Sequence, residues 1–230
     1  ARTAFEMAAD AIRAGKPTNE GTLTAWINEQ FDAHGLTANR ACIVAVGRTA
    51  SDPHYEPPGD GETIKKGDLL LSDLWAGKPD SVPADQTWMG MMDSEVDPRT
   101  QEIWEAVRDA RDAAVTFLRE RFAAGDIIRG FEVDDVSRGV ITERGYGEHF
   151  VHRTGHSIDT ILHGSGPNLD NLETRDDRQL IDGVGFSVEP GIYILGDVGV
   201  RSEINVYWSP EGPVVTPKEI QREIFLLFDD

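Results

Sequence analysis

Apolar residues recur at helical spacing in two segments near the start of the chain, at 5–12 and at 23–31. The pair Lys16-Pro17 separates the two segments, and Gly35 follows the second one. Proline interrupts a helix and glycine commonly ends one, so this spacing predicts two amphipathic helices at the start of the chain.

Strand-like and helical patterns alternate after these helices. Apolar runs predict strands at 42–47 and 68–76, separated by a loop rich in proline and glycine. Asp97 and Pro98 form a good N-cap and first-turn pair for a long helix that Gly125 closes. A shorter helix and further strands are expected at 134–143, 185–195, 199–208 and 223–228. The order helix, helix, strands therefore occurs twice.

This order of elements predicts an α+β fold made of two αβ halves. Helices would lie outside, and strand residues from both halves would surround one central cleft. The halves share no convincing residue-level repeat, so the duplication rests on element order alone. We expect residues 1–230 to form a single domain, since no low-complexity segment or linker divides the chain.

Charge and composition exclude some classes of partner. The formal net charge of −19 argues against nucleic acid and anionic membrane surfaces, which would repel the protein. No apolar run approaches the roughly 20 residues that cross a bilayer, and the first residues lack a signal-peptide pattern. The lone Cys42 cannot form an internal disulfide, which favours a reducing compartment and predicts a cytoplasmic location.

Carboxylates interrupt several apolar segments. Asp73 lies in LLLSDLW, Glu189 in FSVEPGIYIL and Glu203 in GVRSEINVYW. Buried carboxylates are rare unless they are paired, so these positions are candidates for chemistry. Asp85, in PADQTW, is by itself typical of a turn residue. A salt bridge from Arg201 to one of the two glutamates is the ordinary structural alternative.

Histidines cluster in the segment HFVHRTGHSIDTILHG. Within it His152, His156 and His163, three of the six histidines in the chain, fall within twelve residues, and Gly155 permits close backbone approach beside His156. A polar surface loop is the ordinary alternative. An imidazole that converges with four carboxylates is hard to sustain in a buried pocket without cations, because like charges there repel one another. The combination predicts a site for two metal ions.

Five short motifs carry a resemblance to a known family. They are SD (72–73), ADQT (84–87), HRTGH (152–156), VEPGIY (188–193) and VRSE (200–203), and DPHYEPPG (52–59) adds to them. In this order they resemble the pita-bread metallopeptidase family, in particular its Xaa-Pro aminopeptidase and prolidase branch. The resemblance covers nearly the whole chain and implies the pita-bread fold, with two halves related by a pseudo-twofold axis.

The resemblance also implies roles for individual residues. Two divalent metal ions would be held by Asp73, Asp85, His156, Glu189 and Glu203, with Asp85 and Glu203 bridging. Manganese is the first expectation, and cobalt, zinc and iron are alternatives. Glu189, His152, His163 and His54 would be catalytic, and His54, His152, His163 and Arg201 would contact the substrate. Trp75, Trp88, Tyr55 and Phe150 are candidates for the walls of a proline slot.

Some features depart from the family pattern. The connection LWAGKPDSVPA between the first two aspartates is one residue longer than usual, and Trp88 replaces a usual arginine. These changes leave open whether Asp85 or Asp80 is the second aspartate ligand. Proline-directed relatives commonly carry an N-terminal domain before this region, and we expect that domain to be absent from residues 1–230.

The leading hypothesis is hydrolysis of the bond between an N-terminal residue and proline, by attack of a metal-bridging hydroxide. The substrate would be a peptide with proline at its second position, cleaved by an aminopeptidase or a dipeptidase, and a homodimer is possible. One alternative is a metal-free C–N hydrolase of the creatinase kind, and another is a catalytically silent pita-bread binding module. No nucleic-acid or membrane partner is expected.

Overall fold

The first half of the chain forms two helices and three strands of a four-stranded sheet, whose fourth strand comes from near the C-terminus. A computed structural model describes residues 1–228. It begins with α1 (Arg2–Arg13) and α2 (Glu20–Ala33), and the Asn19 side chain caps α2 by accepting a hydrogen bond from the Thr22 amide. The sheet has the order β1 (Ile43–Val46), β2 (Leu69–Ala76), β3 (Ala84–Met91) and β10 (Phe225–Leu226). The first three strands are antiparallel, and β10 lies parallel to β3.

The second half repeats this order with a longer first helix. The side chain of Asp97 caps α3 (Pro98–Ala124), and Gly125 ends this helix with a φ of 73°. It is followed by α4 (Gly130–Glu143) and a short 3-10 helix, η1 (Gly147–His149). The second sheet has the order β4 (Ser157–Ile158), β5 (Gly185–Val188), β8 (Ile204–Ser209) and β9 (Gly212–Thr216). A separate hairpin joins β6 (Gly191–Ile194) to β7 (Val198–Arg201).

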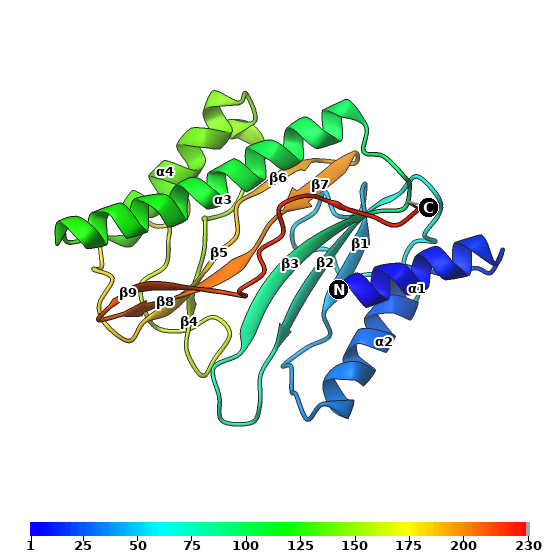
Figure 1. Ribbon diagram of the computed structural model, residues 1–230, viewed down its shortest axis with the longest axis horizontal. Coiled ribbons are helices and arrows are strands. Elements are labelled where there is room, and N and C mark those ends of the chain that lie inside the picture. The colour runs from blue at the N-terminus through cyan, green and yellow to red at the C-terminus, as the bar shows by residue number, and fades with distance from the viewer. Residues whose placement is uncertain (229–230) are drawn as a thin grey trace.

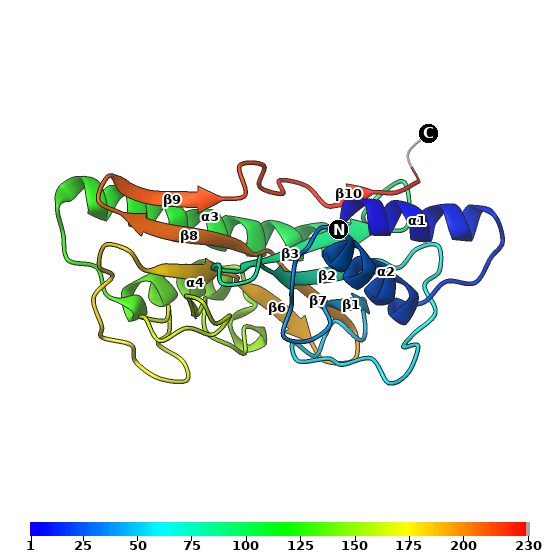
Figure 2. The same cartoon turned by 90° about the horizontal axis from the view of Figure 1, so that it is seen from below.

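The strands lie between two pairs of helices. In Figure 1, α1 and α2 occupy one end of the molecule, and α3 and α4 run along the opposite side. Figure 2 shows that the loop after β1 and the long segment between α4 and β5 extend to the same side of the sheets. A shared apolar core joins the halves, since Trp104 of α3 belongs to one buried cluster with Met89 of β3 and Val200 of β7.

The predicted elements are largely confirmed, with corrections at their ends. Helix α4 begins at Gly130, four residues earlier than predicted, and the last predicted strand shortens to β10. Strands β3, β4 and β9 were not predicted. The long apolar run at 185–195 forms two strands because Pro190 has no amide hydrogen to continue a ladder. The run at 199–208 is likewise interrupted, at Ser202-Glu203.

Two further findings concern the chain as a whole. Over residues 1–228, no helix is both long enough and apolar enough to cross a bilayer. Cys42 is buried and free, and burial, followed by the charge of Asp73, raises the pKa of its thiol to about 12. A thiol with such a pKa stays protonated and is a poor nucleophile at neutral pH.

Candidate metal centre

The structure brings all five predicted metal ligands to one cavity of about 120 Å³ (the metal cavity). The remaining predicted site residues also line it: His54, His152, His163 and Arg201. Its lining comes from both halves of the chain, because Asp73 and Asp85 belong to the first sheet and the other ligands to the second half. The central cleft predicted between two αβ halves is therefore present.

Strand pairing explains why the two aspartates converge. In the antiparallel register of β2 and β3, Asp73 lies opposite Thr87, and Trp75 lies opposite Asp85. Alternate residues of a strand share one face, so all four side chains lie on the same face of the sheet. The side chain of Asn205 fixes the start of β3, because it accepts from the Asp85 amide at 2.9 Å and donates to the Asp85 carbonyl at 2.7 Å.

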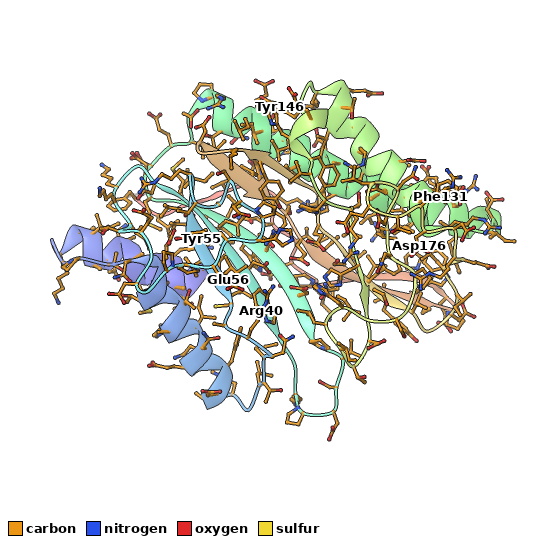
Figure 3. All side chains as sticks on the ribbon, turned by 180° about the vertical axis from the view of Figure 1, so that it is seen from behind. Arg40, Tyr55, Glu56, Phe131, Tyr146 and Asp176 are labelled. Atoms are coloured by element: carbon orange, nitrogen blue, oxygen red, sulfur yellow. The ribbon has the colours of Figure 1, made fainter. Side chains whose placement is uncertain are left out.

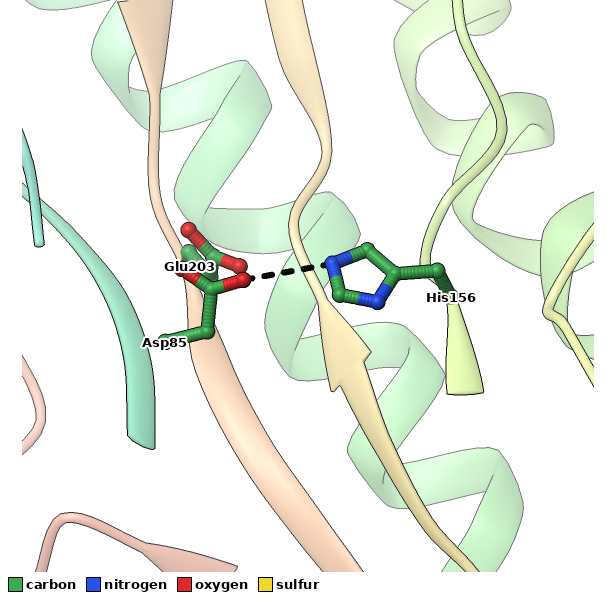
Figure 4. Close-up of side chains that lie close together, drawn as sticks. All are labelled: Asp85, His156 and Glu203. Carbon is green, nitrogen blue, oxygen red and sulfur yellow. Dashed lines mark ion pairs between the residues drawn. The ribbon is translucent and has the colours of Figure 1, made fainter. Parts of the chain in front are cut away.

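The second half brings an imidazole and two glutamates to these aspartates. Nε2 of His156 lies 3.2 Å from an oxygen of Asp85 and 3.5 Å from an oxygen of Glu189. One donor atom each from Asp85, His156 and Glu203 lies within 4.8 Å of the other two (Figure 4). Glu189 directly follows β5, and Glu203 lies between β7 and β8, so both glutamates lie where the chain passes from one strand to the next.

Polar neighbours hold these ligands in place. The Ser187 hydroxyl accepts from the His156 amide at 2.9 Å and donates to Glu189 Oε1 at 2.9 Å. Nδ1 of His156 lies 3.0 Å from the Ser157 carbonyl, a contact that requires the hydrogen on Nδ1 and leaves the lone pair on Nε2. Such partners orient a metal-ligating imidazole.

Arg201 supports the opposite wall of the cavity. Its Nε donates to the Thr87 hydroxyl at 2.8 Å, and that hydroxyl donates to Glu203 Oε2 at 2.8 Å. One Nη pairs with Asp73 Oδ2, and the other donates to the Tyr193 hydroxyl at 3.2 Å. Every nitrogen of this guanidinium therefore has a protein partner.

The sequence matches metallopeptidase family M24 over residues 1–209. The chain belongs to this family. It is 34% identical over 202 residues to the Xaa-Pro dipeptidase of Lactobacillus helveticus, an alignment that covers 87% of this chain and 50% of that protein. The family assignment confirms the resemblance that the five motifs carry.

Solved structures from M24 proteins share the fold. The X-Pro aminopeptidase of Thermotoga maritima superposes with a TM-score of 0.81 at 27% identity, covering 98% of this chain and 59% of that one. The Xaa-Pro dipeptidase of Bacillus anthracis gives 0.78 at 29% identity, covering 99% and 61%. The chain has the α+β pita-bread fold of family M24, and it spans about half the length of the curated relatives it matches.

Electrostatics in this M24 site disfavour ionising all of its carboxylates together. Burial, followed by repulsion from Asp85 and Glu189, raises the pKa of Glu203 well above its usual value. Burial raises the pKa of Asp73 to about 7, although the adjacent Arg201 favours the charged form. Without further positive charge, part of the cluster takes up protons.

The pKa shifts of Glu189 and His156, in contrast, favour the charged form of each group. Burial opposes the charge of Glu189, but His156 and then His152 hold its pKa below the usual value. Burial also opposes charge on His156, but its hydrogen bond to Asp85 and the charge of Glu189 raise its pKa.

These features fit divalent cations. The Nε2 lone pair of His156 faces carboxylate oxygens, and acceptors so arranged need a proton or a cation between them. Asp73 Oδ1 is buried and has no hydrogen-bond partner. Carboxylate oxygens and an imidazole nitrogen together suit manganese, iron, cobalt or zinc. The donor set is therefore chemically complete for a metal centre.

The other predicted histidines occupy different positions around the cavity. His152 is fixed, with Nε2 2.8 Å from the Tyr193 hydroxyl and Nδ1 2.7 Å from the Arg153 carbonyl, and burial lowers its pKa to about 4. His163 lies edge-on to His156 with ring centroids 4.3 Å apart, and burial, followed by His156, lowers its pKa. His54 is exposed at the rim.

The structure separates the two alternative aspartates. Asp80 lies in the turn between β2 and β3, with a φ of 59°, and lines a neighbouring cavity with Trp75. Asp85 is buried and lines the metal cavity with the other four donors. The longer connection is absorbed by the turn, so it does not shift Asp85 out of register with β2.

The proposed aromatic slot walls are not found where they were predicted. Among the described residues that line the metal cavity, none is Trp75, Trp88, Tyr55 or Phe150. Trp75 and Phe150 are core residues, Trp88 stacks on Phe225 with centroids 5.8 Å apart, and Tyr55 donates to a carboxylate of α2. The apolar part of the lining is instead Ile43, Pro53 and Leu162.

Sequence reasoning missed several residues at the site. Thr87 donates to Glu203, and Ser187 donates to Glu189. Thr87 lies two residues after Asp85 and Ser187 two residues before Glu189, a spacing that could have identified both. Arg40 lines the cavity and pairs with Glu56 at 3.5 Å (Figure 3). Its guanidinium lies 4.8 Å from the ring centroid of Trp75. No local pattern distinguishes Arg40 from a surface arginine.

Proposed function

We propose that this chain is the catalytic part of a metal-dependent peptidase that hydrolyses the bond between an N-terminal residue and proline. The convergence of five metal-binding side chains from both halves in one cavity carries the proposal. Membership of a metallopeptidase family and similarity to proteins named Xaa-Pro dipeptidase support it. Because the chain spans about half of those proteins, the assignment of their activity to it is part of the proposal.

In this proposal Asp73, Asp85, His156, Glu189 and Glu203 would hold two divalent ions. When bound, such ions would supply a water with a lowered pKa and Lewis acidity toward the scissile carbonyl. Manganese is the metal we propose first. The single buried thiol, Cys42, supports a reducing compartment, and we propose the cytoplasm.

Glu189 is the residue we assign to proton transfer. Ser187 orients one of its oxygens, and neighbouring positive groups keep it ionised, so it can accept a proton from the attacking water. The leaving group is the imide nitrogen of proline, which has no hydrogen of its own and must be protonated to depart as an amine. A glutamate beside the attacking water can serve both transfers.

Of His152 and His163, His163 is the better placed to stabilise the oxyanion. Both ring nitrogens of His152 already have protein partners, whereas His163 is exposed at the cavity and packs edge-on against His156. Its lowered pKa keeps it neutral at pH 7, with one N–H to donate. Removing a single oxyanion donor typically costs about 3 kcal/mol of transition-state stabilisation.

The two remaining predicted contacts receive different assignments. His54 lies exposed at the rim, where it can meet the proline side of a bound peptide. Since every nitrogen of Arg201 has a protein partner, we assign Arg201 to supporting Asp73 and Thr87 rather than to the substrate.

The test is a substrate panel with metal control. The protein, freed of metal by chelation and reloaded with manganese, is assayed on Xaa-Pro dipeptides, on longer Xaa-Pro-Xaa peptides and on matched Xaa-Ala peptides. We expect cleavage of proline peptides that chelation abolishes and Glu189→Gln reduces at least a hundredfold. Dipeptides cleaved alone indicate a dipeptidase, and longer peptides cleaved as well indicate an aminopeptidase.

Other results would reject the proposal in distinct ways. Activity that survives chelation favours a metal-free C–N hydrolase, and a metal-loaded protein inactive on every proline peptide favours a binding module. The homodimer stays a prediction, which light scattering of the eluting protein tests.

A further inference from the structure

We propose that Asp134, acting with Arg138, is a positioning residue of the metal centre. Both residues belong to α4 and neither lines the metal cavity. Together they hold the segment 150–156, which brings His152 and His156 to the site. The inference rests on the proposed metal centre and adds a requirement that none of the predicted ligands supplies.

Asp134 is fully buried and its carboxylate is saturated with hydrogen bonds. Oδ1 accepts from the amide of Thr154 at 2.8 Å and from its hydroxyl at 2.7 Å. Oδ2 accepts from the amide of Asn171 at 3.1 Å. One carboxylate therefore fixes two segments far apart in the chain, and one of them ends two residues before His156.

Arg138, one helical turn after Asp134, adds hydrogen bonds to the same segment. It pairs with Asp134 through two contacts of 3.1 Å and donates to the carbonyls of Phe150 and His152, each at 2.8 Å. Its guanidinium also lies 4.2 Å from the ring centroid of Phe150. Helix α4 thus holds residues 150, 152 and 154 of the histidine segment from one side.

Thr154 connects the hydrogen bonds from α4 to two proposed metal ligands. Its carbonyl accepts from the Glu189 amide at 2.7 Å, and the His156 carbonyl accepts from the Ser187 amide at 2.9 Å. The intervening Gly155 packs so closely that an added Cβ would lie 2.0 Å from the Ser187 carbonyl oxygen. A shift of Thr154 therefore moves the His156 and Glu189 backbones together.

The first half contains a matched control. Glu20, the first residue of α2, is also fully buried and accepts four hydrogen bonds, two of them from the Val46 and Glu62 amides and one from the Tyr55 hydroxyl. It holds the loop that carries His54, and none of the five proposed metal ligands lies in that loop. Both carboxylates stabilise the fold, but only Asp134 holds a segment with a metal ligand.

The experiment compares Asp134→Asn with Glu20→Gln in the whole chain. Each metal-free protein is titrated with manganese chloride by calorimetry, and the cobalt-loaded proteins are examined by visible absorption spectroscopy. Thermal unfolding in chelator measures what each variant loses in stability alone. We expect Asp134→Asn to weaken manganese affinity about 10- to 100-fold and to alter the cobalt spectrum. Glu20→Gln should keep manganese affinity within about twofold of wild type, because its contacts are remote from the ligands.

Arg138→Lys and Thr154→Val keep the proposal testable if Asp134→Asn does not fold. Thr154→Val removes only the hydroxyl bond to Asp134, so we expect a smaller loss of affinity in the same direction. Arg138→Lys keeps the charge but cannot reach both carbonyls, and it should do the same. Wild-type affinity and an unchanged cobalt spectrum in every folded variant of Asp134, Arg138 and Thr154 would overturn the inference.

The same data keep this inference apart from the proposed function. If wild type binds no manganese, the metal centre itself is wrong and the positioning role falls with it. If wild type binds manganese but cleaves no proline peptide, the substrate proposal fails while the comparison of variants still decides the role of Asp134.

Discussion

Replacing Glu203 with glutamine separates a metal ligand from a structural ion pair. In the structure Glu203 is buried and accepts a hydrogen bond from Thr87, and burial, followed by repulsion from Asp85 and Glu189, raises its pKa, which favours the protonated form when no cation is present. Glutamine has the shape of a protonated glutamate and can accept the same hydrogen bond. Glu203→Gln should therefore change the metal-free stability by less than about 1 kcal/mol.

The effect should appear when metal is added. At a manganese concentration 100 times the dissociation constant, one bound ion stabilises the wild-type fold by about 2.7 kcal/mol. A variant whose affinity is 100-fold weaker keeps only about 0.4 kcal/mol of this at the same concentration. The difference of about 2.3 kcal/mol corresponds to roughly 5–9 °C in Tm for a domain of this size.

The assay is thermal and urea unfolding of both proteins, each in chelator and in excess manganese. Near-equal stability in chelator, with a gap that opens on adding manganese, is the expected result. A loss of more than about 3 kcal/mol in chelator would refute the reasoning, because it would identify Glu203 as the ionised partner of a structural salt bridge.

Three further outcomes are expected. In chelator, the stability of wild type relative to Asp73→Asn should be greatest below about pH 4 and fall as pH rises through about 7, because the fold keeps Asp73 neutral up to its raised pKa. Urea titrations from pH 4 to 8 measure this difference in stability, and a difference that grows with pH contradicts the prediction. Gly155→Ala should cost about 1–3 kcal/mol by calorimetry, because its Cβ would overlap the Ser187 carbonyl, whereas Gly139→Ala in α4 has free space and should be neutral or stabilising. Cys42 should resist thiol reagents in the native protein and react in urea, and rapid native labelling would exclude the buried, protonated thiol described above.

Local patterns predicted the parts of the fold that depend on periodicity and end signals. The long helix α3 has its cap at Asp97 and its stop at Gly125, both visible in the sequence. Strand β3 was missed because its first residues, ADQT, are polar and resemble a turn. Asp85 lines the metal cavity and Thr87 donates to Glu203, so the missed strand reflects the site rather than a weak propensity.

The candidate site was predictable where a polar residue contradicts its surroundings. Glu189 interrupts an apolar run beside Pro190, and in the structure it lies where the chain passes from β5 to β6. Asp134 and Arg138 were not predicted, since an aspartate and an arginine four apart on a helix are typical of a solvent-exposed pair. Their burial depends on the segment 150–154, which only tertiary structure brings to α4.

The division of the donors between the two sheets has a mechanical consequence. Cations bound there would cross-link strands of the two halves of the chain, much as a disulfide links distant segments. Metal binding would then make both halves unfold together, whereas metal removal would let them separate more readily along the cleft between them. The side chains proposed to hold the ions would thus also hold the two halves of the fold together.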